Sequence, residues 1–238
     1  SITKKYFRFT NSKKQFWLKK LFKNKTLSII ESYKLIADYG IKFPRMKEVS
    51  SIDEANNFAT KINFPLVLKT SNKSIFHKTE VNGVFTNINS FSELKLNYKD
   101  LSKRLGKGVI ISEMILEGLE LSLGYINDID FGPAISISAG GTLIELIDDK
   151  IIFSAPVSPK EVKSKIYNLK ISSLFNGYRG SKKLDVELLC KTISKFSELA
   201  WDFKEIISEI DINPLMLNSK GVFALDSLII INNQNKNS

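Results

Sequence analysis

Four serines in this chain are each followed three residues later by a glutamate, and these pairs indicate where helices begin. In such an S-x-x-E pattern the serine side chain accepts a hydrogen bond from an unpaired backbone N–H in the first helical turn. The four pairs are Ser28 and Glu31, Ser51 and Glu54, Ser90 and Glu93, and Ser158 and Glu161. The chain is therefore expected to alternate between short capped helices and the segments that separate them.

Those separating segments contain short apolar runs, which predict buried strands. The runs are FPLVLKT (64–70), GVIISEMI (108–115), LELSLGYI (119–126), PAISISAGG (133–141), TLIELID (142–148), KIIFSAPV (150–157), EIDINPLML (209–217) and GVFALDSLII (221–230). The longest amphipathic helix is expected over 184–203, where apolar residues recur on one face. Together these patterns predict a mixed α/β fold.

The net charge of +10 is concentrated at the start of the chain. Residues 1–25 carry nine lysines and arginines and no acidic residue, which leaves a net charge of +1 for the remainder. Aromatic and aliphatic residues alternate with these cations, so the segment could bind phosphates or a membrane surface. We favour the alternative, a linker or leader that packs on another domain, and expect no nucleic-acid partner.

A single cysteine, Cys190, excludes internal disulfides and cysteine-rich metal sites, and it fits a reducing cytoplasm. The sequence has no run of about 18 apolar residues. Its first residues lack the apolar core of a signal peptide. We expect a cytoplasmic protein without a transmembrane segment.

Two neighbouring segments carry residues suited to phosphate chemistry. Lys69 follows the apolar residues of the run 64–70 and could meet a phosphate at the end of that strand, although a strand-end lysine is more often an exposed edge residue. His77, the only histidine, opens the polar segment HKTEVNGV (77–84), whose backbone N–H groups could cradle an anion. A lone histidine usually has no chemical role, so only the residues around His77 can indicate whether it takes part in a reaction.

Oxygen-bearing side chains gather on the last predicted strands. They are Glu209, Asp211, Asn213 and Asp226. Carboxylate and amide oxygens on adjacent strands could share a Mg²⁺ ion, which completes its octahedron with phosphate and water. Ordinary turn chemistry at the Asn-Pro sequence is the competing interpretation.

Nine short motifs follow one another over about residues 26–232. In chain order they are YGI, FPLVLKT, FHKTEVNGV, ISEMILEGLEL, FGP, SAGGTLIEL, NGYRG, EIDINPL and ALD. In this order and spacing they resemble the ATP-grasp subunit or domain of the ADP-forming (NDP-forming) acyl-CoA synthetases. That family is related to the nucleotide-binding subunit of succinyl-CoA synthetase. Each motif is weak alone, and the set is highly specific.

The resemblance implies an ATP-grasp fold, in which two α+β lobes enclose the nucleotide. The smaller lobe, with an entry helix, is expected over 26–116 and the larger lobe over 117–232. A basic arm or linker would then occupy 1–25 and a polar tail 233–238.

The resemblance also implies roles for single residues around ATP or ADP and Mg²⁺. His77 is expected to be phosphorylated transiently, and Asn213 and Asp226 to hold Mg²⁺. The nucleotide is expected to meet Lys69 at the phosphates, Gly83 in the loop over them, the backbone of Glu113, Met114 and Ile115 at the adenine edge, and Glu120 at the ribose. Four further motif residues have no assigned role: Gly140, Gly141, Glu145 and Arg179.

The chain departs from the family pattern beside the expected phosphate loop. Where the family commonly has two glycines, this chain has Asn82 and Gly83. Asparagine tolerates a positive φ better than most residues, so the loop can keep its shape. An arginine often found shortly afterwards is replaced by Phe85 and Thr86.

The implied function is that of an acid–thiol ligase, the ADP-forming acyl-CoA synthetase. A phosphoryl group would pass between a transient phosphohistidine at His77 and ADP, because a neutral imidazole is a good nucleophile near pH 7. The chain has no G-x-G-x-x-G segment for CoA. The resemblance implies that a CoA-binding α-type subunit or fused domain carries that segment and handles acyl-CoA and phosphate. The alternative is a non-catalytic nucleotide-sensing regulatory domain of an acyltransferase fusion.

Overall fold

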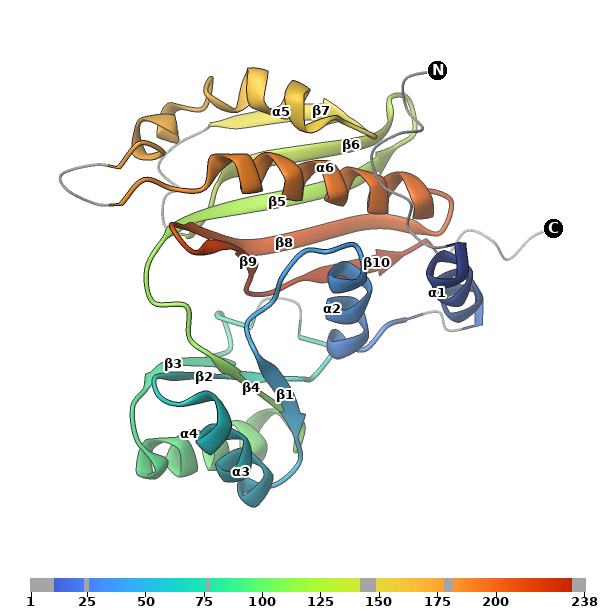
Figure 1. Cartoon of the computed structure of the whole chain (residues 1–238). Coiled ribbons are helices and arrows are strands. Elements are labelled where there is room, and N and C mark those ends of the chain that lie inside the picture. The colour runs from blue at the N-terminus through green and yellow to red at the C-terminus, as the bar shows by residue number, and fades with distance from the viewer. Residues whose placement is uncertain (1–10, 24–25, 76–77, 142–148, 178–181, 233–238) are drawn as a thin grey trace. The chain divides into compact units, whose positions relative to one another are not determined.

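The computed structural model describes residues 11–23, 26–75, 78–141, 149–177 and 182–232 (Figure 1). The chain divides into two compact units. The small unit comprises residues 28–30 and 43–116, and the large unit comprises residues 1–27, 31–42 and 117–238. Each unit contains helices and an antiparallel sheet, so the predicted mixed α/β architecture is confirmed.

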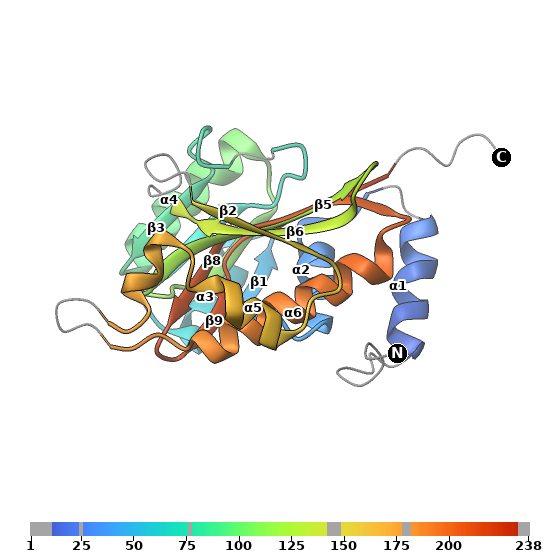
Figure 2. The same ribbon diagram turned by 90° about the horizontal axis from the view of Figure 1, so that it is seen from above.

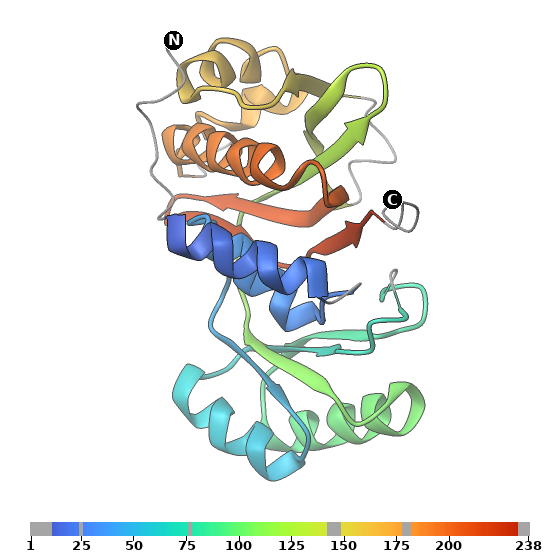
Figure 3. The same cartoon turned by 90° about the vertical axis from the view of Figure 1, so that its right-hand side faces the viewer.

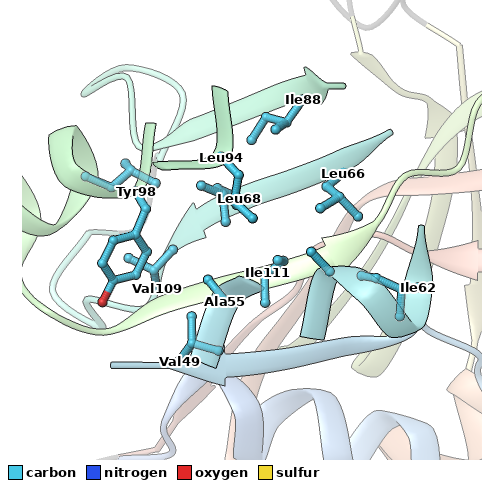
Figure 4. Close-up of a cluster of buried hydrophobic side chains, with 12 residues drawn as sticks. Val49, Ala55, Ile62, Leu66, Leu68, Ile88, Leu94, Tyr98, Val109 and Ile111 are labelled. Carbon is cyan, nitrogen blue, oxygen red and sulfur yellow. The ribbon is translucent and has the colours of Figure 1, made fainter. Parts of the chain in front are cut away.

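The small unit is built on a four-stranded antiparallel sheet. The strand order is β1 (Met46–Val49), β4 (Val109–Glu113), β2 (Leu66–Thr70) and β3 (Val84–Ile88). Helices α3 (Ile52–Ile62) and α4 (Phe91–Leu105) contribute to one apolar core with the sheet (Figure 4). Leu66, Leu68 and Ile111 are fully buried in that core, so the alternate residues of β2 and β4 face the other way.

The large unit is built on a six-stranded sheet. Its strands are β10 (Leu228–Ile231), β8 (Ile207–Asn218), β5 (Leu119–Asp128), β6 (Gly132–Ala139) and β7 (Lys150–Ser154) in spatial order, with β9 (Gly221–Ala224) paired to β8. Helices α5 (Pro159–Ile166) and α6 (Val186–Phe203) lie on the same side of this sheet, and the short 3-10 helix η2 spans Lys170–Leu174 (Figure 2). The predicted amphipathic helix is confirmed as α6, which buries its apolar side chains against β5, β6 and β8.

Serine caps begin three of the helices, as predicted. The hydroxyl of Ser51 accepts a hydrogen bond from the N–H of Glu54 at 3.2 Å, and the Glu54 carboxylate accepts one from the N–H of Ser50 at 3.0 Å. The same serine cap begins α4 at Ser90 and α5 at Ser158. These caps satisfy backbone donors that a helix leaves unpaired, which is why the local sequence alone places the helix starts.

The single strand predicted over 221–230 is interrupted in the structure, and that prediction is wrong in this respect. β9 and β10 both pair with β8, and their registers are continuous: Leu215 opposes Ala224 and Asp211 opposes Leu228. The ladder breaks at residues 225–227 because Pro214 in β8 has no N–H to donate.

Other boundaries differ less from the predictions. Helix α4, whose start the Ser90 and Glu93 pair predicted, extends from Phe91 to Leu105. Strands β1 and β3 were not predicted, since each has few buried side chains. The predicted strand 142–148 lies outside the described residues.

The second half of the basic arm forms helix α1 (Asn11–Lys23), which packs on the large unit near α2 (Ile29–Asp38) (Figure 3). Trp17 is 2% exposed, and its indole N–H donates to Asp38 Oδ2 at 2.8 Å. Lysines on both sides of Trp17 pair with acidic residues: Lys13 with Asp38, Lys14 with Asp202 and Lys20 with Glu31. Helix α1 therefore agrees with the interpretation that the basic arm packs on another part of the protein. No helix in the described ranges combines the length and apolar character needed to cross a membrane.

We predict that Trp17→Ala lowers the free energy of unfolding by about 3 kcal/mol, because it empties a buried aromatic site and leaves Asp38 without the indole donor. Chemical denaturation followed by circular dichroism measures the change. The matched control on the same helix is Phe22→Ala, since Phe22 is 69% exposed and its loss should cost under about 0.5 kcal/mol. Equal losses in the two variants would show that α1 does not dock through Trp17.

Candidate functional site

Lys69 lies on the face of the small-unit sheet that is opposite α3 and α4. Leu68 points into the core, so Lys69 points the other way, and its register partners are Val84 and Ile110. The side chain is only 6% exposed. Lysine is rarely buried to this extent unless its charge is compensated. The burial of Lys69 therefore does not fit the alternative of an exposed edge residue.

The segment after His77 closes into a tight turn. The N–H of Gly83 donates to Lys78 O at 2.6 Å, and the Gly83 carbonyl accepts from the N–H of Thr70 at 2.9 Å, which ties the turn to the end of β2. A Cβ at Gly83 would lie 2.9 Å from Lys78 O and 3.1 Å from Thr70 Cγ2, so only glycine fits. Asn82 adopts φ 49°, the left-handed conformation that its identity allows. His77 itself lies outside the described residues.

Lys78 is a candidate that the sequence reasoning missed. It is 8% exposed, and Lys69 is the other buried lysine in the described part of the chain. Both are connected to Gly83, Lys78 through its carbonyl and Lys69 through its neighbour Thr70. The signal available in the sequence was its position directly after the only histidine.

The three residues predicted at the adenine edge differ in whether their backbone N–H already donates a hydrogen bond within the protein. The N–H of Glu113 donates to Arg45 O at 2.9 Å, and the N–H of Met114 donates to Pro65 O at 3.3 Å. Within the described residues, the N–H of Ile115 has no recorded acceptor. A ligand that needs a backbone donor here would therefore bind at Ile115, on a segment held in place by the other two amides.

Arg45 also fixes the Glu113 side chain. Its Nε donates to Glu113 Oε2 at 3.1 Å, while Nη1 donates to the carbonyl of Lys61 at 3.2 Å. One guanidinium thus joins the end of β4 to the C-terminal turn of α3. The fork of five donors on arginine suits this bridge, whereas a lysine has one nitrogen for the same acceptors.

Glu120 lies on β5 of the large unit, on the sheet face opposite α6. Its neighbour Leu121 is fully buried on the α6 side. A Cβ at Gly141 would lie 1.9 Å from Glu120 Oε2, and a Cβ at Gly140 would lie 2.6 Å from the backbone carbon of Leu121. The two glycines therefore make room for the Glu120 carboxylate and for close contact between the backbones of β5 and residue 140. Glu145 and Arg179 lie outside the described residues.

Asn213 and Asp226 occupy facing positions on adjacent antiparallel segments. The register that runs through β9 and β10 places Asp226 opposite Asn213, and the N–H of Leu225 donates to Pro214 O at 2.9 Å beside them. The two predicted metal ligands are thus neighbours in the fold.

The β8 residues on either side of this pair alternate between core and outer face. Ile210 and Ile212 are fully buried, so Glu209, Asp211 and Asn213 share the face opposite α6. On that face the oxygen-bearing side chains of β8 continue the surface on which Glu120 lies. The sheet therefore separates an apolar side from a polar side with acidic character.

Tyr33, from helix α2, holds Asp226 in place and was not predicted. Its hydroxyl donates to Asp226 Oδ1 at 2.6 Å, and the N–H of Ser227 donates to the same oxygen at 2.8 Å. Burial raises the pKa of Tyr33 well above its ordinary value, and the negative charge of Asp226 raises it further. The phenol therefore stays protonated and remains a hydrogen-bond donor.

The donors at this position fit magnesium. An amide oxygen and a carboxylate oxygen are hard ligands, and Mg²⁺ commonly takes one or two protein ligands together with phosphate and water. Among the described residues there is no cluster of three or more histidine, cysteine, aspartate or glutamate side chains that could hold a metal alone. An ion at Asn213 and Asp226 would thus depend on oxygens from a bound ligand.

Comparison with models of protein families identifies the family to which this chain belongs. A model of the ATP-grasp domain matches residues 21–231, and the chain belongs to this family. The fold resemblance predicted from the nine motifs is therefore confirmed.

Two curated relatives narrow the comparison. The chain is 34% identical over 228 residues to the 4-hydroxybutyrate–CoA ligase [ADP-forming] of Nitrosopumilus maritimus, covering 92% of this chain and 32% of that protein. It is 30% identical over 211 residues to the acetate–CoA ligase [ADP-forming] II subunit beta of Pyrococcus furiosus, covering 84% of this chain and 89% of the subunit. The chain thus spans about a third of the first relative and most of the second.

A solved structure has the same fold. The dinucleotide forming acetyl-coenzyme A synthetase 1 of Ca. Korarchaeum cryptofilum, in complex with coenzyme A and Mg-AMPPCP, superimposes with a TM-score of 0.79 at 29% identity. The match covers 93% of this chain and 100% of that chain. That structure is described as having a phosphohistidine segment that points towards the nucleotide-binding site. The recognition of an ADP-forming acyl-CoA synthetase family member is confirmed by these relatives.

We predict that Gly141→Ala weakens ADP binding by about tenfold, because the new methyl group displaces the Glu120 carboxylate. Gly132→Ala is the matched control: Gly132 has φ 73° against 57° for Gly141, but a Cβ there meets nothing within 4 Å. Both variants should lose similar stability from the positive φ, about 1 kcal/mol. Isothermal titration calorimetry with ADP separates the two, and equal affinities would show that Glu120 does not contact the nucleotide.

Proposed function

We propose that this chain is the nucleotide-binding part of an ADP-forming acyl-CoA synthetase, which transfers a phosphoryl group between His77 and ADP. The observation that supports this most strongly is the match to the beta subunit of an ADP-forming acetate–CoA ligase, over 89% of that subunit. The relative of known structure, with its phosphohistidine segment and Mg-AMPPCP, agrees with it.

In the direction of ATP formation, the bond between phosphorus and the His77 imidazole breaks as a β-phosphate oxygen of ADP forms its bond to phosphorus. The histidine is left as free imidazole, so the step is a balanced displacement. Lys69 and Lys78 supply positive charge near the phosphates, and the backbone of the turn that ends at Gly83 lies close to them. Mg²⁺, when bound at Asn213 and Asp226, would neutralise charge on the phosphate oxygens.

The remaining proposed roles concern recognition of the nucleotide. The segment of Glu113, Met114 and Ile115 would meet the adenine edge, with Ile115 as the donor of the backbone N–H. Glu120 would accept hydrogen bonds from the ribose hydroxyls. These contacts orient ADP without taking part in the transfer, so they should affect nucleotide affinity more than the transfer rate.

Coenzyme A chemistry is assigned to a partner. The Nitrosopumilus ligase is about three times as long as the segment matched here, since that segment is 32% of it. We infer that an α-type subunit or fused domain binds CoA, and forms or cleaves the acyl phosphate that charges His77. The buried, free Cys190 is compatible with a reducing cytoplasm as the site of this reaction.

The proposal predicts that ATP labelled with radioactive phosphorus at the γ position transfers the label to this chain in the presence of Mg²⁺. The label should be stable in base and labile in acid, and His77→Ala should abolish it. ADP affinity should change by less than about tenfold, or about 1.4 kcal/mol, because a phosphoryl carrier contributes to transfer and not to ground-state binding. Undiminished acyl-CoA-dependent ATP formation by His77→Ala with its partner would refute the carrier role and favour the regulatory alternative.

The metal assignment predicts a graded effect of two substitutions. Asp226→Asn should abolish Mg²⁺-dependent labelling, and Tyr33→Phe should raise the Mg²⁺ concentration for half-maximal labelling by about tenfold, since it only releases the orienting hydrogen bond. Glu205→Gln, a change on an exposed turn, serves as the control. If Asp226→Asn and Glu205→Gln behave alike, Asp226 has a structural role only.

A further inference from the structure

The turn that follows His77 is held by a residue that no motif indicated. Arg104, in the last turn of α4, donates from Nη1 to the carbonyl of Val81 at 3.0 Å and from Nη2 to the carbonyl of Asn82 at 2.9 Å. The described residues contain no other recorded donor to these two carbonyls. A single side chain thus closes the outer side of the turn.

The guanidinium is itself held in one orientation. Asp100, one helical turn earlier, accepts from Arg104 Nε at 3.0 Å and 2.9 Å, and from Nη2 at 2.6 Å. These contacts lower the pKa of Asp100 and raise the pKa of Arg104, so both stay charged at neutral pH. All the nitrogens of the arginine fork are therefore used, two of them on the turn.

This arrangement does little for overall stability, because both side chains are exposed and an exposed pair on one helix is screened by water. Its effect is local. Inside the turn, the recorded backbone bonds run from Gly83 to Lys78 and from Asn82 to Thr79, and Asn82 is held at a positive φ. Among the described residues, the Arg104 bonds are what connects the carbonyls of Val81 and Asn82 to a helix.

We propose that Arg104 is a positioning residue for phosphoryl transfer, which holds the 78–83 turn and with it Gly83 in one orientation. This turn directly follows His77 in the sequence. The inference rests on the proposed function, because its expected consequence is a change in the rate of phosphoryl transfer to His77. In this proposal Arg104 acts through the two backbone carbonyls of Val81 and Asn82. Lysine cannot replace it, because one ammonium cannot bind Asp100 side-on and two successive carbonyls together.

Two readouts on the intact chain test this proposal. Hydrogen exchange of peptides that contain residues 78–83 reports whether the turn is held, and the rate of His77 labelling by Mg-ATP reports whether its placement matters. Arg104→Ala should speed exchange at Asn82 and Gly83 by about tenfold and slow labelling by at least about tenfold. ADP affinity should fall by less than the labelling rate does, which separates positioning for transfer from nucleotide binding.

Further variants separate the clamp from general helix effects. Lys103→Ala, an exposed cation one residue earlier on α4, should leave exchange, labelling and the unfolding midpoint unchanged. Arg104→Lys and Asp100→Ala should give intermediate rates, since each removes part of the fork geometry. The Asp100→Ala and Arg104→Ala double variant should be no slower than Arg104→Ala, because the two residues act as one unit.

Each outcome decides one part of the proposal. Unchanged exchange in Arg104→Ala would refute the clamp, and faster exchange with an unchanged labelling rate would refute the positioning role. A wild-type chain that takes no label from Mg-ATP would refute the proposed function and the catalytic consequence together. The exchange measurement would still decide whether Arg104 holds the turn.

Discussion

Strand β8 is the element on which the large unit depends. It pairs with β5 on one side and with β9 and β10 on the other, and Ile210, Ile212 and Leu215 are fully buried. A slip of one residue in its register would move Asp211 and Asn213 into the core, which no nearby gain could offset. Apolar packing thus fixes where the oxygen ligands lie. Pro214, which interrupts the ladder, leaves Asn213 and Asp226 in register without a full set of backbone bonds.

In the small unit, two arginine side chains hold the backbone segments that carry candidate site residues. Arg45 binds the carbonyls of Lys61 and Ile62 together with Glu113, and Arg104 binds the carbonyls of Val81 and Asn82 together with Asp100. In each case one guanidinium connects a carboxylate to two consecutive carbonyls. The chain has four arginines, and both of those in the described residues serve as backbone anchors of this kind. A lysine-rich sequence would keep arginine where a fork of donors is needed.

Local signals explain how much of the fold was predictable. The capping serines and the apolar face of α6 depend on residues within one or two turns, so the sequence carries them directly. The break between β9 and β10 was hidden, because its cause is a proline in the facing strand. Tyr33 and Asp226 are 193 residues apart in the chain, and no spacing rule connects a helix tyrosine to a distant aspartate. Arg104 was also missed, because its acceptors on the turn are backbone carbonyls, which no residue type in the sequence marks.

The basic arm shows how a strong compositional signal can be local in its effect. In α1, Lys13, Lys14 and Lys20 meet Asp38, Asp202 and Glu31, so these charges are matched within the large unit.

Asp202 lies one turn after Glu198 on α6, and burial, with the nearby charge of Asp202, raises the pKa of Glu198 to about 7. The folded chain therefore binds more protons than the unfolded chain between the ordinary glutamate pKa of 4.5 and about 7. Through this group, stability decreases as the pH rises across that window. Pairing of Lys14 with Asp202 offsets part of the repulsion that the two carboxylates would otherwise share, which makes the docking of α1 part of the electrostatic balance of α6.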